Sequence, residues 1–195
     1  MKKNIITIGG LLGSGKSSTA KAVASALGFR HFSSGDLFRQ IAAERGESIE
    51  AMNISAEAQR DIDIKVDKLL QEMYRNEEKL VIDSRMAWHW MPGSFKVFLV
   101  LDPETAARRI YVHLQQGGRT SEDARSVEEA RNSIDRRFAS EQKRYAGLYG
   151  VNPTDPLNFD IVINTKHNNL ETVTTMLLAA YQAWRMDEED LSPQQ

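Results

Sequence analysis

The chain has 195 residues and a formal net charge of −2 at pH 7, so it gives no basis for a nucleic-acid-binding surface. Hydrophobic residues make up 41% of the sequence and charged residues 27%, and no apolar run reaches the roughly 18 residues of a membrane span, which disfavours disordered and membrane proteins. Cysteine is absent, which excludes disulfides and thiolate metal sites and makes the cytoplasm the expected location. The length predicts a single domain, which we expect to be a monomer.

Short apolar runs alternate with amphipathic segments along the first half of the chain. Residues 5–8 are rich in β-branched side chains and are followed by glycines, which predicts a central strand buried on both faces. A helix is predicted from Ser17 to the C-capping Gly28, and a short strand follows at residues 29–32. The apolar spacing within residues 55–75 predicts a further amphipathic helix.

The alternation continues in the second half, where strands are predicted at residues 80–83, 97–102 and 160–164. Asp102 as N-cap and Pro103 at the first helical position predict a helix after the second of these strands. Ser126 and Glu129 form a capping box for a long helix that reaches toward Gly147. The inward face of the last helix is predicted to carry Val173, Met176, Leu177, Ala180 and Trp184. Strands that alternate with helices predict an α/β fold of three layers (α/β/α) with a parallel five-stranded sheet.

Residues 10–17 read GLLGSGKS and match the phosphate-binding pattern Gly-x-x-x-x-Gly-Lys-Ser, with a predicted strand before them and a predicted helix after them. Glycines allow a turn in which successive backbone N–H groups point at phosphate oxygens. Lys16 places an ammonium on the β- and γ-phosphates, and the Ser17 hydroxyl is suited to ligate Mg²⁺. The motif therefore predicts a P-loop NTPase site for ATP or GTP with Mg²⁺, and it leaves the acceptor open. The predicted nucleotide-binding residues are Gly10, Gly13, Ser14, Gly15, Lys16, Ser17 and Ser18.

Four arginines lie where a cleft is predicted, at Arg39, Arg85, Arg137 and Arg144. On the long helix Arg137, Glu141 and Arg144 are spaced i, i+4 and i+7, so they share one stripe. An apolar stripe beside it holds Ile134, Phe138 and Tyr145. The charged stripe is either a surface salt-bridge ladder or a pair of guanidinium groups that point at one ligand. Beside a P-loop the second interpretation gains weight, because transfer between two polyanions needs cations.

Several segments together resemble the cytidylate kinases, especially their compact archaeal-type branch, over nearly the whole chain. They are GLLGSGKSS, SSGDLFR at 33–39, DSR at 83–85, and RFASEQKRYAGLYGV with FDIVINT late in the chain. The pair Asp63 and Asp67 belongs to the same resemblance. The resemblance implies a nucleoside monophosphate kinase with ATP as donor and a small-molecule nucleotide as acceptor. Its expected parts are a core (about 1–35, 79–112 and 155–186), an acceptor-binding region (about 36–78), a lid (about 113–150) and a solvated acidic tail (187–195).

The resemblance also implies a role for each matching residue. Ser34 and Arg39 would hold the acceptor phosphate, and Arg85 would contact the monophosphate nucleotide. The two lid arginines would grip phosphates on closure, with Glu141 near a ribose or orienting them. The expected catalytic residues are Lys16, Asp83, Arg137 and Arg144, and the expected acceptor-binding residues are Ser34, Asp36, Arg39, Arg85 and Glu141.

Three features depart from the family pattern or allow more than one role. Ser84 stands where the family usually has a glycine. The aromatic segment at residues 86–91 either packs under the sheet edge, which we favour, or forms a stacking wall for a base. Asp83 either holds Mg²⁺ through water or has a capping or salt-bridge role.

The implied mechanism is in-line transfer of the γ-phosphoryl group of ATP to a phosphate oxygen of CMP or dCMP, which needs no general base. A shikimate- or gluconate-type alcohol kinase is an alternative, and it needs a carboxylate base such as Asp36 or Asp83. A nucleotide-binding regulatory protein is a second alternative, although sensing does not need the arginine set. A preference for AMP or UMP as acceptor also stays open.

Overall fold

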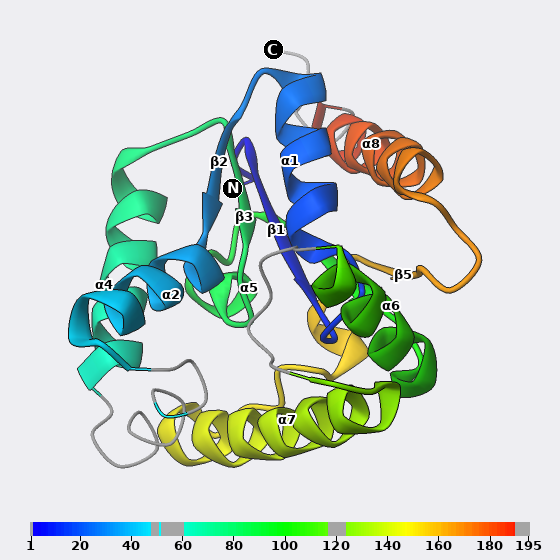
Figure 1. Ribbon diagram of the computed structural model, residues 1–195. Helices are drawn as coiled ribbons and strands as arrows, with labels where there is room; N and C mark the ends of the chain where they lie inside the picture. The colour runs from blue at the N-terminus through cyan, green and yellow to red at the C-terminus, as the bar shows by residue number, and fades with distance from the viewer. Residues whose placement is uncertain (1, 48–50, 52–60, 117–123, 190–195) are drawn as a thin grey trace.

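The computed structural model describes residues 2–47, 51, 61–116 and 124–189 (Figure 1). The strands are β1 (Ile5–Gly10), β2 (Arg30–Ser33), β3 (Leu80–Asp83), β4 (Phe95–Val100) and β5 (Ile161–Asn164). The helices are α1 (Lys16–Leu27), α2 (Ser34–Arg45), α4 (Asp61–Asn76), α5 (Ala87–Trp90), α6 (Pro103–Gln115), α7 (Val127–Tyr149) and α8 (Leu170–Glu189), with a short 3₁₀ helix η1 (Pro156–Asn158) before β5. The first residues of the helix predicted at 55–75 lie outside the described residues.

The five strands form one parallel sheet in the order β2-β3-β1-β4-β5, which confirms the predicted α/β fold. The register aligns Ser33 of β2 and Ile8 of β1 with Asp83 at the end of β3. Parallel strands end at the same edge of a sheet, so segments that are distant in the sequence meet there. This is the edge at which ligands bind in open α/β sheets.

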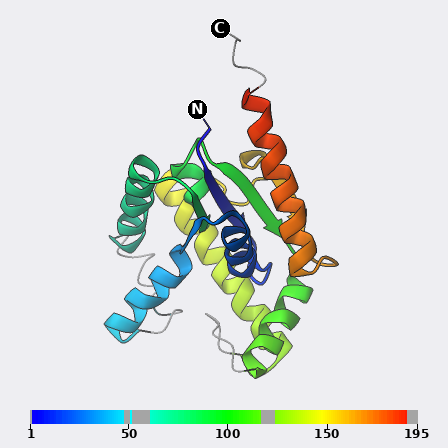
Figure 2. The same ribbon diagram turned by 90° about the horizontal axis from the view of Figure 1, so that it is seen from above.

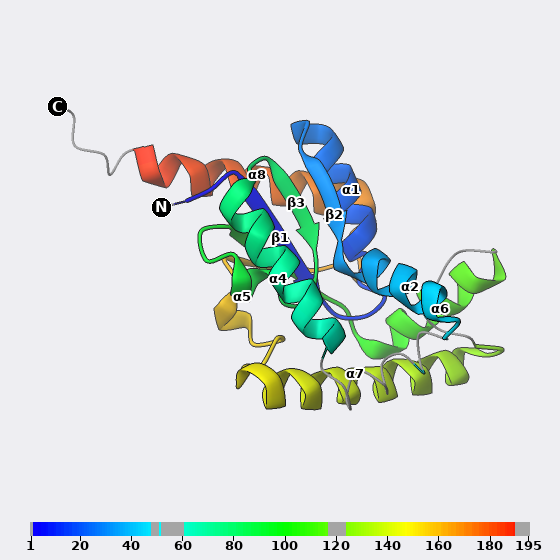
Figure 3. The ribbon, with the colours of Figure 1, turned by 90° about the vertical axis from the view of Figure 1, so that its left-hand side faces the viewer.

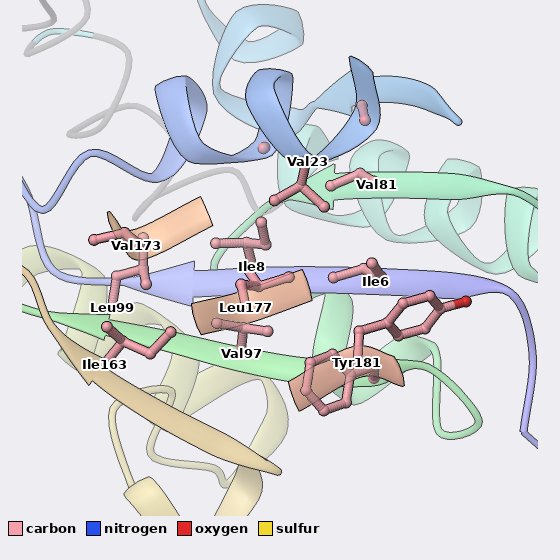
Figure 4. Packing of buried hydrophobic residues seen from close by; sticks show 13 residues of the cluster. Ile6, Ile8, Val23, Val81, Val97, Leu99, Ile163, Val173, Leu177 and Tyr181 are labelled. Atoms are coloured by element: carbon pink, nitrogen blue, oxygen red, sulfur yellow. The ribbon is translucent and has the colours of Figure 1, made fainter. Parts of the chain in front are cut away.

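Helices α1 and α8 cover one face of the sheet. Val23 of α1 and Leu177 and Tyr181 of α8 pack against Ile8 and Val97 of the central strands, and all five side chains are buried (Figure 4). The opposite face of the sheet is covered as well, so β1 is apolar at successive positions and does not alternate. The two covered faces explain why isoleucines occupy both even- and odd-numbered positions of this strand.

Helices α4 and α5 cover the other face, where Leu70 and Met91 pack against Ile5 and Ile82. Figure 3 shows α4 in front of the strands. In Figures 1 and 3 β1 points toward α7, which runs across the molecule beyond the carboxyl ends of the strands. Figures 1 and 2 show α2 and α4 at one side of the molecule and α6 and α8 at the other. The carboxyl edge of the sheet is thus surrounded by α2, α4, α6 and α7.

The ends of the helices follow from local sequence. Asp102 caps α6 by accepting a hydrogen bond from the backbone N–H of Thr105 at 2.9 Å. Ser126 accepts one from the N–H of Glu129 at 3.1 Å and caps α7. The Glu129 carboxylate reaches one residue further back than in a standard capping box and accepts from the N–H of Arg125 at 2.7 Å. The expected long helix therefore begins where the sequence predicts.

Four expectations about helices are wrong. Helix α7 passes through Gly147 and ends at Gly150, whose φ of 65° is the left-handed conformation that stops a helix. Met176 is 46% exposed, because it lies about 100° around the helix from the buried Leu177. Phe138 is 38% exposed and so contributes little to the predicted apolar stripe. The acidic tail expected from residue 187 begins as helix, since α8 continues to Glu189.

Among residues 2–47, 51, 61–116 and 124–189, no helix is both long enough and apolar enough to cross a membrane. The same part of the chain has no group of three or more His, Cys, Asp or Glu side chains arranged to hold a metal ion.

Candidate active site

The P-loop connects β1 to α1 and turns sharply at its glycines. Gly13 and Gly15 have φ values of 72° and 86°, which side chains rarely adopt. A Cβ at Gly10 would lie 2.5 Å from the carbonyl oxygen of Leu99, so only glycine fits beside β4 at this position. The loop therefore has the backbone conformation of a phosphate cradle at the N-terminus of a helix.

Side chains of the loop bond back to its own backbone. The Ser14 hydroxyl and the Lys16 ammonium both donate to the carbonyl oxygen of Leu11, at 2.7 Å and 2.8 Å. Burial lowers the pKa of Lys16 well below its usual value, Arg85 lowers it further, and Glu141 opposes this effect. The site thus concentrates cations that a bound anion would stabilise.

Asp83 at the end of β3 accepts hydrogen bonds from three side chains. The hydroxyls of Ser17 and Ser33 donate to Oδ2 at 2.6 Å and 3.1 Å, and Nε2 of His31 lies 2.7 Å from Oδ1. Burial raises the pKa of Asp83, but the bonds from His31 and Ser17 outweigh it and hold the pKa below its ordinary value. The carboxylate is therefore ionised and lies beside the hydroxyl of the P-loop.

Glu141 of α7 lies between two arginines that come from distant parts of the chain. It accepts hydrogen bonds from Nε of Arg85, which follows β3, and from Nε of Arg137 at 3.0 Å. Arg85 also donates to the carbonyl oxygen of Gly10. Glu141 is 4% exposed, and although burial raises its pKa, Arg85 and Arg137 hold the pKa at about 2. The charged stripe of α7 is therefore buried at the site, and the interpretation as a surface ladder is wrong.

Arg144 is more deeply buried than Arg137, whose side chain is 20% exposed. The side chain of Arg144 is 4% exposed, and its Nε lies 3.0 Å from Oδ2 of Asp63 on α4. The guanidinium carbon lies 5.9 Å from the ring centroid of Phe38 and 5.1 Å from that of Tyr145. The two helix arginines, which the sequence predicts to point at one ligand, both line the smaller of the two cavities at this edge, and Arg137 also lines the larger one.

Two cavities meet at this edge of the sheet. We call the larger one the P-loop cleft; its volume is about 870 Å³, within the range of cavities that hold nucleotide-sized ligands. We call the smaller one the inner chamber; its volume is about 70 Å³, and it lies between α2, α4 and α7. The residues that line both cavities are Ser34, Gly35, Arg39, Ser84, Arg85 and Arg137. A ligand in one cavity therefore lies next to a ligand in the other, with guanidinium groups at the junction.

The predicted site residues divide between these cavities. The P-loop cleft is also lined by Gly13, Lys16, Ser17, Ser18, Asp36 and Asp83. The inner chamber is also lined by Arg144, together with Asp63, Asp67, Phe38 and Tyr145. Neither cavity is lined by Gly10, Ser14, Gly15 or Glu141, which instead shape the loop or hold the arginines. Asp36 forms an ion pair with Arg39.

The aromatic segment after Arg85 packs inside the protein. Trp88 is 8% exposed and donates to the carbonyl oxygen of Arg85 at 2.9 Å. Trp90 donates to Oδ1 of Asp67 at 2.8 Å. Neither ring lines the P-loop cleft or the inner chamber, so the structure agrees with the packing interpretation.

Some site residues escaped prediction. His31 bonds to Asp83 only because β2 lies beside β3, and strand order is not visible in the sequence. Lys21 lines the P-loop cleft, and its spacing of four residues from Ser17 on one helix could have indicated this. Phe38 is one residue from the predicted Arg39, but its contact with Arg144 depends on how α7 packs.

A parallel sheet with a P-loop, a half-buried P-loop lysine and an arginine-lined junction between two cavities defines the class of P-loop kinases, and the protein is an ATP-dependent kinase. The chain belongs to the cytidylate kinase-like family, whose model matches residues 5–167. Cytidylate kinase of Methanopyrus kandleri is 34% identical over 180 residues, which cover 90% of this chain and 92% of that protein. Cytidylate kinase of Methanobrevibacter smithii is 30% identical over 174 residues, which cover 89% of this chain and 96% of the relative.

Solved structures share the fold at lower identity. An uncharacterized protein from Eubacterium ventriosum has a TM-score of 0.68 and 21% identity, over 93% of this chain and 99% of that one. Shikimate kinase from Bacteroides thetaiotaomicron has a TM-score of 0.62 and 17% identity, over 91% and 98%. A gluconokinase from Sinorhizobium meliloti has a TM-score of 0.61 and 16% identity, over 99% and 100%. These likenesses support the P-loop kinase fold alone.

Proposed function

We propose that the protein transfers the γ-phosphoryl group of ATP to a phosphate oxygen of CMP or dCMP, which gives ADP and the nucleoside diphosphate. The observation that carries this proposal is the junction of the two cavities, where Arg39, Arg85 and Arg137 line both. Guanidinium groups bind phosphate oxygens in a bidentate way and offset the repulsion between two polyanions. The relatives named above, which are cytidylate kinases, support cytidine as the acceptor nucleoside.

The residues of the chain have separate tasks in this reaction. The P-loop backbone and Lys16 hold the β- and γ-phosphates of ATP in the P-loop cleft. Arg39 and Ser34 hold the acceptor phosphate at the junction. Glu141 orients Arg85 and Arg137 by accepting a hydrogen bond from each. These two arginines stabilise the charge on the transferring group. An acceptor phosphate oxygen is already anionic at neutral pH, so positioning and charge stabilisation suffice.

Ser17 and Asp83 are the residues that would hold Mg²⁺. Their oxygen atoms lie 2.6 Å apart, and a hydroxyl beside an ionised carboxylate is the kind of donor set that this cation prefers. When bound, Mg²⁺ neutralises charge on the β- and γ-phosphates. The hydroxyls of Ser17 and Ser33 and the ring of His31 keep the carboxylate of Asp83 oriented toward the P-loop.

The alcohol kinase alternative fits the site less well. It needs a carboxylate that can take a proton from a hydroxyl. Asp83 already accepts three hydrogen bonds and has a lowered pKa, and Asp36 is paired with Arg39. A set of arginines at the junction suits a phosphorylated acceptor better than a neutral alcohol.

A coupled assay that measures ADP formation tests the proposal, with ATP·Mg²⁺ and a panel of CMP, dCMP, UMP, AMP, shikimate and gluconate. We expect turnover with CMP or dCMP and none with the two alcohols. A Lys16→Ala variant serves as control and should abolish turnover, since it removes the cation on the β- and γ-phosphates. Turnover with shikimate or gluconate, and with none of the nucleotides, would contradict the proposal.

A further inference from the structure

The inner chamber contains a buried carboxylate that has no task in the mechanism above. Asp63 of α4 lines the chamber with a side chain that is 9% exposed. Its Oδ2 accepts no hydrogen bond from the described residues, although Nε of Arg144 lies 3.0 Å away. The two groups form an ion pair, but without a well-aligned hydrogen bond this buried carboxylate oxygen is incompletely satisfied. The chamber therefore offers an acceptor position that a donor on a ligand would satisfy.

Asp67, the second carboxylate of the chamber, is occupied by the protein itself. Trp90 donates to its Oδ1 at 2.8 Å, and the hydroxyl of Tyr149 donates to its Oδ2. These bonds join α4 to α5 and α7. Asp67 therefore has a structural task, and Asp63 is the carboxylate that can bind a ligand.

We propose that Asp63 and Arg144 read the edge of the acceptor base and thereby select cytosine over uracil; this inference rests on the proposed function. Cytosine presents a 4-amino donor next to the N3 acceptor, and uracil presents an O4 acceptor next to an N3–H donor. An adjacent carboxylate and guanidinium match the first edge. With uracil, O4 would face the carboxylate of Asp63, and N3–H would face the guanidinium of Arg144.

Adenine has the same order of donor and acceptor as cytosine, so a second feature must exclude it. The inner chamber has a volume of about 70 Å³. A cavity of about 150 Å³ binds benzene, so even a single ring requires the walls to part or the base to extend into the opening toward the P-loop cleft. A two-ring purine requires far more space. The charged pair thus rejects oxo bases, and a purine would have to displace more of the chamber walls than a pyrimidine does.

The ionisation of Asp63 agrees with this role. Burial, together with the charges of Asp67 and Glu141, raises its pKa to about 6 against the lowering effect of Arg144 of α7. At pH 7 the group is mainly a carboxylate, which only accepts hydrogen bonds. The apolar side chains of Phe38 and Val66 line the same chamber and limit the access of water to the pair.

An Asp63→Asn variant tests the inference through the ratio of kcat/KM for CMP to kcat/KM for UMP. The amide can donate to O4 of uracil, so we expect the ratio to fall by about 10- to 100-fold, the worth of one hydrogen bond to a charged group. Asp61→Asn is the matched control, because it replaces an exposed aspartate of the same helix with asparagine. The control should keep the ratio of the wild-type protein. A folded Asp63→Asn variant with an unchanged ratio would overturn the inference.

A second measurement uses the wild-type protein and does not depend on the folding of a variant. Calorimetry compares the binding of CMP with that of the 2-pyrimidinone ribonucleoside 5′-monophosphate, which lacks the amino group but keeps the ring. We expect binding that is weaker by about 10- to 100-fold. Equal affinities would overturn the inference. A wild-type protein that phosphorylates no nucleotide would instead contradict the proposed function, so the two failures are distinguishable.

Discussion

Glu141 shows how a single buried residue organises the arginines of the site. Its carboxylate accepts hydrogen bonds from Arg85 and Arg137, which are separated by 52 positions in the sequence but meet at the junction of the two cavities. A pair of guanidinium groups would repel each other without an anion between them. The local rule of helical spacing predicts that Glu141 and Arg137 are neighbours, but it cannot predict Arg85, because that contact depends on tertiary packing.

Glu141→Gln should change how stability depends on pH. The pKa of Glu141 is held at about 2, below its ordinary 4.5, so the carboxylate stabilises the fold fully above about pH 4.5 and loses this effect as the pH falls toward 2. We expect the variant to lose up to about 3 kcal/mol of unfolding free energy at pH 7, and less as the pH falls. Denaturant unfolding of both proteins between pH 3 and pH 7 measures the difference.

Asp135→Asn is the control for this prediction. Asp135 lies on the same helix and pairs with Arg131 on the surface, so its loss should cost less than about 1 kcal/mol. A difference between wild type and Glu141→Gln that stays constant over the whole pH range would contradict the prediction.

At the scale of elements, α7 links the two sides of the site. Its N-terminal half packs on α6 through Ala130 and Ile134. Its C-terminal half meets α4 through Arg144, which forms an ion pair with Asp63, and through Tyr149, which donates a hydrogen bond to Asp67. The helix must therefore reach its full length for the inner chamber to be complete.

Two glycines of this helix should respond in opposite ways to alanine. Gly147 is helical and exposed, and nothing lies within 4 Å of the position of a Cβ, so Gly147→Ala should stabilise the protein by about 0.5–1 kcal/mol. Gly150 ends the helix with a φ of 65°, and Gly150→Ala should destabilise the protein by about 1–2 kcal/mol. Thermal unfolding of the two variants checks the signs. The same sign for both would show that the end of the helix is misplaced.

The sequence was most informative where structure depends on neighbours in the chain. The P-loop, the cap at Asp102 and the parallel sheet all follow from local patterns and from the order of elements. The contacts of His31 with Asp83 and of Arg144 with Asp63 do not, since each joins elements whose relative position only packing determines. The end of α7 was misjudged because glycine permits both a helical and a left-handed backbone.

At the scale of the whole molecule, α8 completes the core although it lies far from the site in sequence. Val173 and Leu177 pack on β1, the strand that leads into the P-loop, and on β5 at the edge of the sheet. The division into core, acceptor-binding region and lid stays a prediction, as does the monomeric state. The described residues form one sheet with a buried hydrophobic core on each of its two faces.

Leu177→Ala should therefore weaken the whole fold. Its side chain is completely buried, and removal of a buried leucine costs about 2–5 kcal/mol through lost burial and the cavity left behind. The adjacent Met176 is 46% exposed, and Met176→Ala should cost less than about 1 kcal/mol. Equilibrium unfolding in denaturant compares the two variants. Equal losses would indicate that the predicted inward face of α8, with Met176 included, was correct after all.

The distribution of charge has a consequence for how substrates arrive. The chain carries a net charge of −2, but its P-loop cleft is lined by Lys16, Lys21, Arg39, Arg85 and Arg137. A nucleotide that approaches from a distance meets a weakly repulsive protein, and attraction begins only within about 8 Å at physiological ionic strength. Capture therefore depends on the last step of the encounter and not on long-range steering. Such an enzyme selects phosphate-bearing ligands only once they reach the mouth of the cleft. The rest of its surface does not attract other polyanions in solution.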